Sequence, residues 1–251
     1  HPVRRFATTC CIIALVVFTG AKIAAPTATI SEVLAAYAKA CGDTDRLKTH
    51  TTLIEQSVIE SAENTETLRI VRAKVPDKIR IETLSATGCL VQGFDGFTAW
   101  CVLRPRNGRP LAVPLDPDTE RELRLAARSA LRNPLLEADT FGLTLTLSSD
   151  DEAGHHLVAV NNGARELYRL RIDRDSGRPL ARIESRQGQQ IITRYDSFRM
   201  IDGVNWPATA TTSFAGNNTA TWRLAQLRLD EKLDDDLFAP PAGTASPTPA
   251  L

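Results

Sequence analysis

Residues 67–100 read TLRIVRAKVPDKIRIETLSATGCLVQGFDGFTAW, and this stretch decides the fold class. Apolar side chains recur at every second position, as in Leu68 and Ile70, which is the spacing of one face of a β-strand. Turn residues at Pro76 and at Asp95-Gly96 interrupt the alternation. An Asp-Gly pair between two apolar runs is a strong hairpin signal. The stretch therefore predicts successive antiparallel strands joined by tight turns.

The same alternation continues along most of the chain beyond residue 140. Its apolar members are Leu143, Leu145, Leu147, Tyr168, Leu170, Ile172 and Ile191. Two segments have a helical period instead: one that Ser31 can cap and that ends before Gly42, and an amphipathic one over residues 117–132. We therefore expect a mainly β (α+β) domain over residues 30–243, followed by a disordered tail at 244–251.

Composition narrows the class of protein. The chain has 251 residues, 43% of them hydrophobic, and its 30 basic side chains equal its 30 acidic ones. This length and apolar share are sufficient for a buried core, and they exclude a disordered or collagen-like chain. A zero formal charge argues against a nucleic-acid-binding protein, which usually carries a clustered basic excess. A soluble globular domain that does not bind nucleic acid is the expectation.

The first 25 residues have the pattern of a secretory signal peptide. Arg4 and Arg5 precede an apolar run from Cys10 to Phe18, and small residues follow it. The run is short for a bilayer-spanning helix, although an uncleaved anchor is the alternative. The pattern predicts export and a mature chain that is soluble after cleavage.

Export makes a disulfide chemically possible, and the hairpin at residues 88–103 offers one. A three-residue loop at 94–96 would place Cys89 opposite Cys101, whereas a two-residue loop would direct them to opposite faces. We expect the Cys89–Cys101 disulfide, which leaves Cys41 as a free thiol at the end of a helix.

No catalytic or metal-binding motif stands out. The chain lacks the G-x-S-x-G, G-x-G-x-x-G, P-loop and H-E-x-x-H patterns. His155 and His156 are adjacent, so a strand would direct them to opposite faces. A hydrolase that uses Asp95 with His155 has the least support, because no base–nucleophile pair is recognisable. We expect a protein that is not an enzyme and that uses neither a metal nor a cofactor.

Several short motifs, taken in order, resemble the LolA/LolB-like family of outer-membrane lipoprotein-sorting proteins. They are residues 67–72, 76–82, 93–100, 133–136, 167–177, 195–207 and the closing 237–243. The likeness covers about residues 30–243. It departs at one position, because Val75 precedes the turn proline where the carrier has an arginine that is thought to latch its lid.

The resemblance implies an open antiparallel half-barrel of about eleven strands, with helices over its concave face. That face would hold a lipid or a lipoprotein acyl group in a non-catalytic periplasmic carrier or sensor, expected to be a monomer with a possible envelope protein partner. The expected ligand-binding residues are Leu68, Ile70, Ile79, Ile81, Trp100, Leu143, Leu145, Tyr168, Leu170 and Ile191.

Two alternatives remain open at this point. Trp100 has a purely structural explanation, because a tryptophan on the strand after a tight turn buries a large apolar area in any β protein. The concavity could also be filled by the protein's own side chains. The chain would then be a structural or interaction module of the cell envelope without a lipid ligand.

Overall fold

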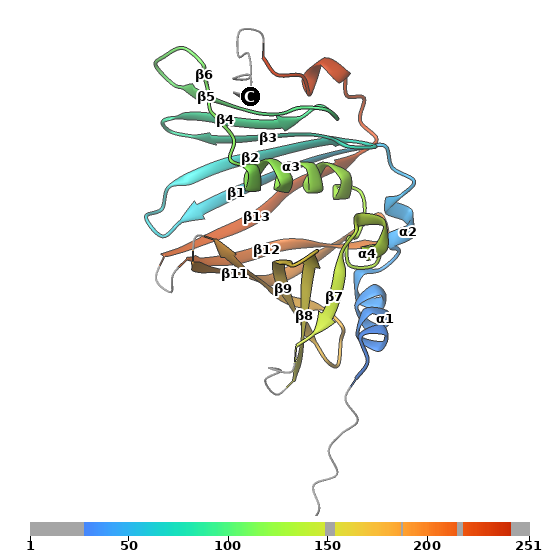
Figure 1. Ribbon diagram of the computed structural model, residues 1–251. Coiled ribbons are helices and arrows are strands. Elements are labelled where there is room, and N and C mark those ends of the chain that lie inside the picture. The colour runs from blue at the N-terminus through green and yellow to red at the C-terminus, as the bar shows by residue number, and fades with distance from the viewer. Residues whose placement is uncertain (1–27, 149–153, 187, 215–217, 242–251) are drawn as a thin grey trace, which may run out of the picture.

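The chain folds around one open, antiparallel sheet, shown by the computed structural model of residues 28–148, 154–186, 188–214 and 218–241 (Figure 1). The described residues form thirteen strands in the order β6-β5-β4-β3-β2-β1-β13-β12-β11-β10-β9-β8-β7. The half-barrel prediction is confirmed, with two more strands than expected. The expected signal peptide at 1–25 and the tail at 244–251 lie outside the described residues.

The strands follow the predicted alternation closely. They are β1 (Thr52–Ser61), β2 (Glu66–Lys74), β3 (Lys78–Ser85), β4 (Gly88–Phe94), β5 (Ala99–Pro105), β6 (Leu111–Ala112), β7 (Thr144–Leu147), β8 (His155–Asn162), β9 (Arg165–Asp173), β10 (Pro179–Arg186), β11 (Gln189–Ile201), β12 (Val204–Phe214) and β13 (Asn218–Leu229). The helices are α1 (Ile30–Cys41), α2 (Thr44–Leu47), α3 (Pro117–Ser129) and α4 (Ala138–Phe141), with a 3-10 turn at Asp235–Leu237.

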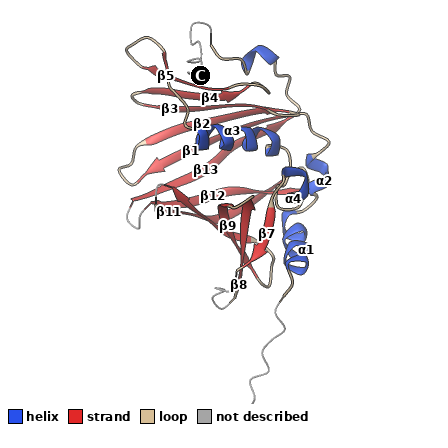
Figure 2. Ribbon diagram, viewed as in Figure 1, coloured by secondary structure: helices blue, strands red, loops and turns tan. Residues whose placement is uncertain are grey.

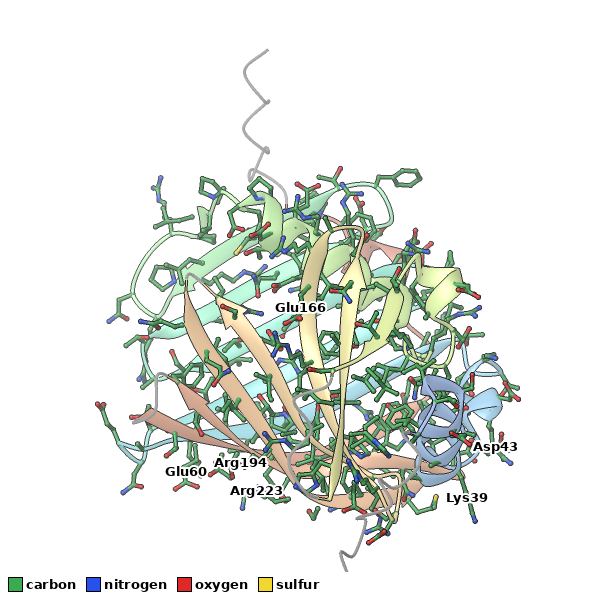
Figure 3. All side chains as sticks on the ribbon, turned by 60° about the horizontal axis from the view of Figure 1, so that its bottom comes forward. Lys39, Asp43, Glu60, Glu166, Arg194 and Arg223 are labelled. Atoms are coloured by element: carbon green, nitrogen blue, oxygen red, sulfur yellow. The ribbon has the colours of Figure 1, made fainter. Side chains whose placement is uncertain are left out.

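The longer helices cover one face of the sheet, which we call the inner face (Figure 2). Helix α3 contacts β3, β4 and β5, and α1 contacts β7 and β12. Thr29, rather than the expected Ser31, caps α1, because its side chain and that of Glu32 form a reciprocal capping box. The opposite, outer face is solvated in part, and Arg194 and Arg223 lie there (Figure 3).

Two separate apolar clusters lie on the inner face, one in each half of the sheet. The first packs Leu123, Ala127 and Leu131 on residues of β1 to β4 such as Val71 and Ile79. The second packs Tyr37 and other residues of α1 on Leu143 and on residues of β8 and β9 such as Leu170. The sheet is therefore covered at two places rather than along its whole width.

The C-terminal segment packs on the outer face over β3 to β5. Phe238 is completely buried there. The Trp100 indole nitrogen donates to the Phe238 carbonyl at 2.8 Å, and an Arg80 guanidinium nitrogen donates to the Leu237 carbonyl at 3.0 Å. The Trp100 ring lies against Gly93, where a Cβ atom would be 2.4 Å from the indole. Trp100 is thus an outer-face core residue.

The predicted disulfide is wrong, because the β4–β5 turn is longer than expected. Phe94 pairs with Ala99, so residues 95–98 form a four-residue loop, which the Asp95 carboxylate stabilises by accepting from the backbone N–H groups of Phe97 and Thr98. Cys89 then pairs with Arg104, and Cys101 lies on the other face of the sheet. Cys41, Cys89 and Cys101 are all free thiols, and Cys41 is buried at the end of α1 as expected.

Removal of the Phe238 ring should test the importance of the outer-face packing. We expect Phe238→Ala to lower the free energy of unfolding by about 3–5 kcal/mol, because a fully buried aromatic side chain leaves a cavity. The matched control is Phe97→Ala, since Phe97 is 85% exposed and should change stability by less than about 0.5 kcal/mol. Urea unfolding of both variants measures the difference, and equal stabilities would contradict this assignment.

Candidate functional site

Two cavities lie between the helices and the inner face of the sheet. The first, which we call the charged cavity, has a volume of about 510 Å³ and lies between α3, the β8–β9 turn and β10. The second, the aromatic cavity, has a volume of about 330 Å³ and lies between α1, residues 129–135 and strands β9 to β12. Both volumes fall in the range of about 300–1,000 Å³ that is typical of small-molecule sites.

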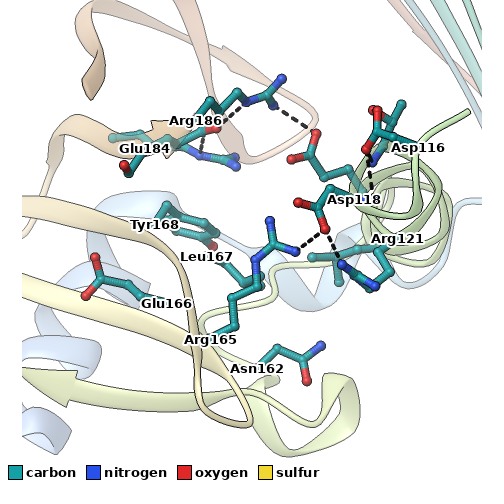
Figure 4. A pocket seen from close by; sticks show the side chains of 15 residues that line it. Asp116, Asp118, Arg121, Asn162, Arg165, Glu166, Leu167, Tyr168, Glu184 and Arg186 are labelled. Carbon is teal, nitrogen blue, oxygen red and sulfur yellow. Dashed lines mark hydrogen bonds and ion pairs between the residues drawn. The ribbon is translucent and has the colours of Figure 1, made fainter. Parts of the chain in front are cut away.

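Ion pairs between α3 and the strands cross the charged cavity (Figure 4). An Arg165 guanidinium nitrogen is 2.6 Å from an Asp118 carboxylate oxygen, and an Arg186 nitrogen is 2.9 Å from a Glu122 oxygen. Each of these four side chains is about half exposed. Exposed pairs of this kind contribute little to stability, because solvent screens them. These ion pairs hold the first turns of α3 over the cavity. Little energy is needed to separate them.

The first turn of α3 is fixed by its own cap as well. The Asp116 carboxylate accepts from the backbone N–H groups of Asp118 and Thr119, both at 2.9 Å. Hydrogen bonds from Thr119 lower the pKa of Asp116, so this carboxylate stays ionised in mild acid. Pro117 occupies the first helical position, where its ring fixes the backbone φ angle at a helical value.

Apolar and aromatic side chains dominate the aromatic cavity. Its ring-bearing members are Tyr37, Tyr168, Tyr195, Phe198 and Trp206. The Asn133 side-chain amide donates to the Tyr37 hydroxyl at 3.3 Å, which fixes the segment after α3 against α1. Burial raises the pKa values of Tyr37 and Tyr195, so both hydroxyls stay neutral at physiological pH.

Arg182 and Tyr168 line both cavities and form the wall between them. The Arg182 guanidinium carbon lies 4.1 Å from the centroid of the Tyr168 ring, which is a cation–π contact. Its Nε atom is 2.6 Å from an oxygen of Glu184, two residues along β10 on the same face. One side of the wall is thus a charged surface and the other an aromatic one.

The structure brings several expected site residues together. Tyr168 and Leu170 line the aromatic cavity, and Leu143 and Leu145 pack in the same cluster. Ile191 pairs with Glu184 and therefore shares the inner face. Ile79 and Ile81 also lie on the inner face, but in the other cluster beneath α3.

Leu68, Ile70 and Trp100, which were expected among the ligand-binding residues of the concave face, do not lie on that face. Ile70 pairs with Glu82 and Leu68 with Leu84, whereas the inner-face residues Ile79 and Ile81 pair with Ala73 and Val71. Leu68 and Ile70 therefore lie on the outer face, as Trp100 does. Two apolar residues, Ile70 and Val71, are consecutive, so the alternation alone could not decide which of them faces inward.

The charged residues of the site do not follow from the apolar alternation of the sequence. Arg182 and Glu184 lie on either side of Ile183 in β10, and their side chains face inward while Ile183 faces outward. The signal was visible, since charged residues at every second position of a strand mark a polar face. In the described part of the chain, no group of histidine, cysteine and acidic side chains has an arrangement that could hold a metal ion.

Comparison with known proteins shows the fold. No protein-family profile and no curated protein sequence matches the chain. Among solved structures, a LolA superfamily protein from Nitrosomonas europaea aligns with a TM-score of 0.50 and 13% identity, over 85% of this chain and 99% of that one. A DUF1329 family protein from Desulfovibrio piger aligns with a TM-score of 0.54 and 9% identity, over 85% and 98% of the two chains.

The fold is therefore LolA-like, as the sequence motifs indicated. Across the residues that the structure describes, none of the helices is both long enough and apolar enough to cross a membrane.

The Asp118–Arg165 pair should be visible in the titration of Asp118. Hydrogen bonding to Arg165 lowers the pKa of this carboxyl, so its contribution to stability is present above the unfolded pKa of about 3.9 and is lost as pH falls through the lower folded pKa. We expect Arg165→Gln to raise the Asp118 pKa in a carboxyl NMR titration, because the guanidinium that lowers it most is removed. An unchanged pKa would show that Arg165 does not hold α3.

Proposed function

We propose that this protein is a non-catalytic carrier or sensor that binds a lipid or a lipoprotein acyl group in the aromatic cavity. The observation that carries the proposal is the cavity itself, about 330 Å³ of space lined by tyrosine, phenylalanine, tryptophan and aliphatic side chains. A ligand site of this kind is mostly apolar with a few polar groups that orient the ligand. The LolA-like fold is consistent with such a role.

The contacts of helix α3 support the proposal, because apolar packing holds one side of the helix and exposed ion pairs hold the other. The Leu123 and Ala127 side chains of α3 are buried on the sheet, while its charged side chains bridge to β9 and β10 only through half-exposed ion pairs. We propose that these pairs open so that α3 can move away from the sheet while a chain enters the aromatic cavity. This opening would use Asp118 and Glu122 in place of the arginine that the carrier proper has before the turn proline.

A non-catalytic role agrees with the protonated state of Cys41, the one cysteine that lines the aromatic cavity. Burial raises the pKa of Cys41, which disfavours the thiolate that nucleophilic catalysis requires. We further propose a periplasmic location on the basis of Arg4, Arg5 and the apolar run that follows them.

Filling the aromatic cavity tests the proposal directly. Ala130 follows α3 and lines the cavity, so Ala130→Phe should reduce the space and weaken binding of a neutral apolar fluorescent probe by at least about tenfold. The matched control is Ala126→Phe, four residues earlier within α3 and also half-buried, but outside both cavity linings. We expect this control to bind the probe as the wild type does.

Both substitutions add bulk, and each should cost about 1–3 kcal/mol of stability, so probe binding is measured well below the unfolding transition of either variant. Wild-type protein that takes up no probe would reject the carrier proposal and favour an envelope interaction module with a self-filled concavity. An equal loss of probe binding in both variants would show that the probe does not bind in the aromatic cavity.

A further inference from the structure

We infer that the aromatic cavity selects an anionic amphiphile, whose acidic group binds at Arg182 while its chain occupies the apolar interior. This inference rests on the proposed function and names the class of lipid that the cavity takes. Its basis is the charge of the lining. Three arginines, Arg132, Arg178 and Arg182, line the aromatic cavity, and none of its lining residues is an aspartate or a glutamate.

The three arginines differ in how far they are already neutralised. Arg132 is 2.7 Å from Glu137, which does not line the cavity, so its charge is balanced from outside. Arg182 makes its ion pair with Glu184 through Nε. Among the residues that the structure describes, neither of its two terminal nitrogens donates a hydrogen bond, so both can donate to a carboxylate or a phosphate.

Arg178 lies nearer the surface and extends the positive charge to the edge of the cavity. Its side chain is exposed, and it precedes Pro179, which also lines the cavity. An exposed arginine at this place would attract an anion before the anion reaches Arg182.

A further donor inside the cavity has no acceptor. The Trp206 indole nitrogen is buried and has no hydrogen-bond partner among the described residues, and Trp206 lines the cavity. Indole N–H groups only donate, and a buried donor usually finds an acceptor. A ligand rich in acceptor oxygens would supply one, which an alcohol or an alkane chain does less well.

The charged cavity on the other side of the wall restricts where the anion can bind. Five carboxylates line it, from Asp116, Asp118, Glu122, Glu166 and Glu184. Their charge balances the arginines there and disfavours an incoming anion. The acidic group is therefore expected on the aromatic side of Arg182, where the lining carries no carboxylate.

The experiment compares laurate with lauryl alcohol, two ligands of equal chain length that differ in head-group charge. Each displaces the neutral fluorescent probe from the wild-type protein at neutral pH and below its micelle concentration. We expect laurate to bind at least about tenfold more tightly than the alcohol, as charge-assisted hydrogen bonds to a guanidinium allow. Arg182→Gln should abolish this preference, so that the variant binds laurate and lauryl alcohol with affinities within about twofold of each other.

Two further variants keep the inference falsifiable. Arg182→Lys retains the charge and should retain part of the preference for laurate. Arg171→Gln is the matched control on the neighbouring strand β9, because Arg171 pairs with Ala181 and lies outside both cavity linings. It should bind both ligands as the wild type does.

The outcomes separate this inference from the proposed function. Equal affinity of the wild type for the two ligands would overturn the anionic selection and leave the carrier function standing. Failure of both ligands to displace the probe, or failure of the probe to bind, would remove both the inference and the carrier function. A preference for laurate that persists in Arg182→Gln would show that the acidic group binds away from the wall.

Discussion

An open sheet leaves its apolar inner face in water unless another part of the chain covers it. A closed barrel would bury this face against itself, but here β6 and β7 stay apart as edge strands. Apolar area is worth about 25 cal/mol per Å² when it is removed from water, so an uncovered face would destabilise the fold. Helices α1 and α3 supply the cover, each over one half of the sheet.

The space between the two covered halves follows from this arrangement. Two short helices cannot contact every strand of a thirteen-stranded sheet, and the cavities lie where their packing ends. Strand β10 passes through this region, and it carries Arg182 and Glu184 on its inner face instead of apolar residues. Arg182 packs on the Tyr168 ring and divides the space into a charged part and an aromatic part.

Much of the fold could be predicted from the sequence, because alternating apolar residues and turn residues are local signals. The strands at 66–74 and 78–85 and the helix that begins at Pro117 lie where the pattern placed them. Register could not be predicted in the same way. The length of the 95–98 loop depends on how the Asp95 carboxylate bonds to the backbone, and the choice between Ile70 and Val71 depends on which neighbour each packs against.

The candidate site was predictable only in its apolar half. Tyr168 and Leu170 belong to the alternation and do line the aromatic cavity. The arginines come from separate segments that only the folded chain brings together. A cavity, moreover, cannot be predicted from a sequence pattern, because it results from where the helices end rather than from any one residue.

We propose that a lipid occupies the space under the helices in the working protein. Native mass spectrometry of protein purified under mild conditions tests this proposal, with the Ala130→Phe variant in parallel. We expect an added mass on the wild type that corresponds to an acyl-bearing molecule and is absent from the variant. A bare mass for the wild-type protein, even after incubation with laurate, would contradict it.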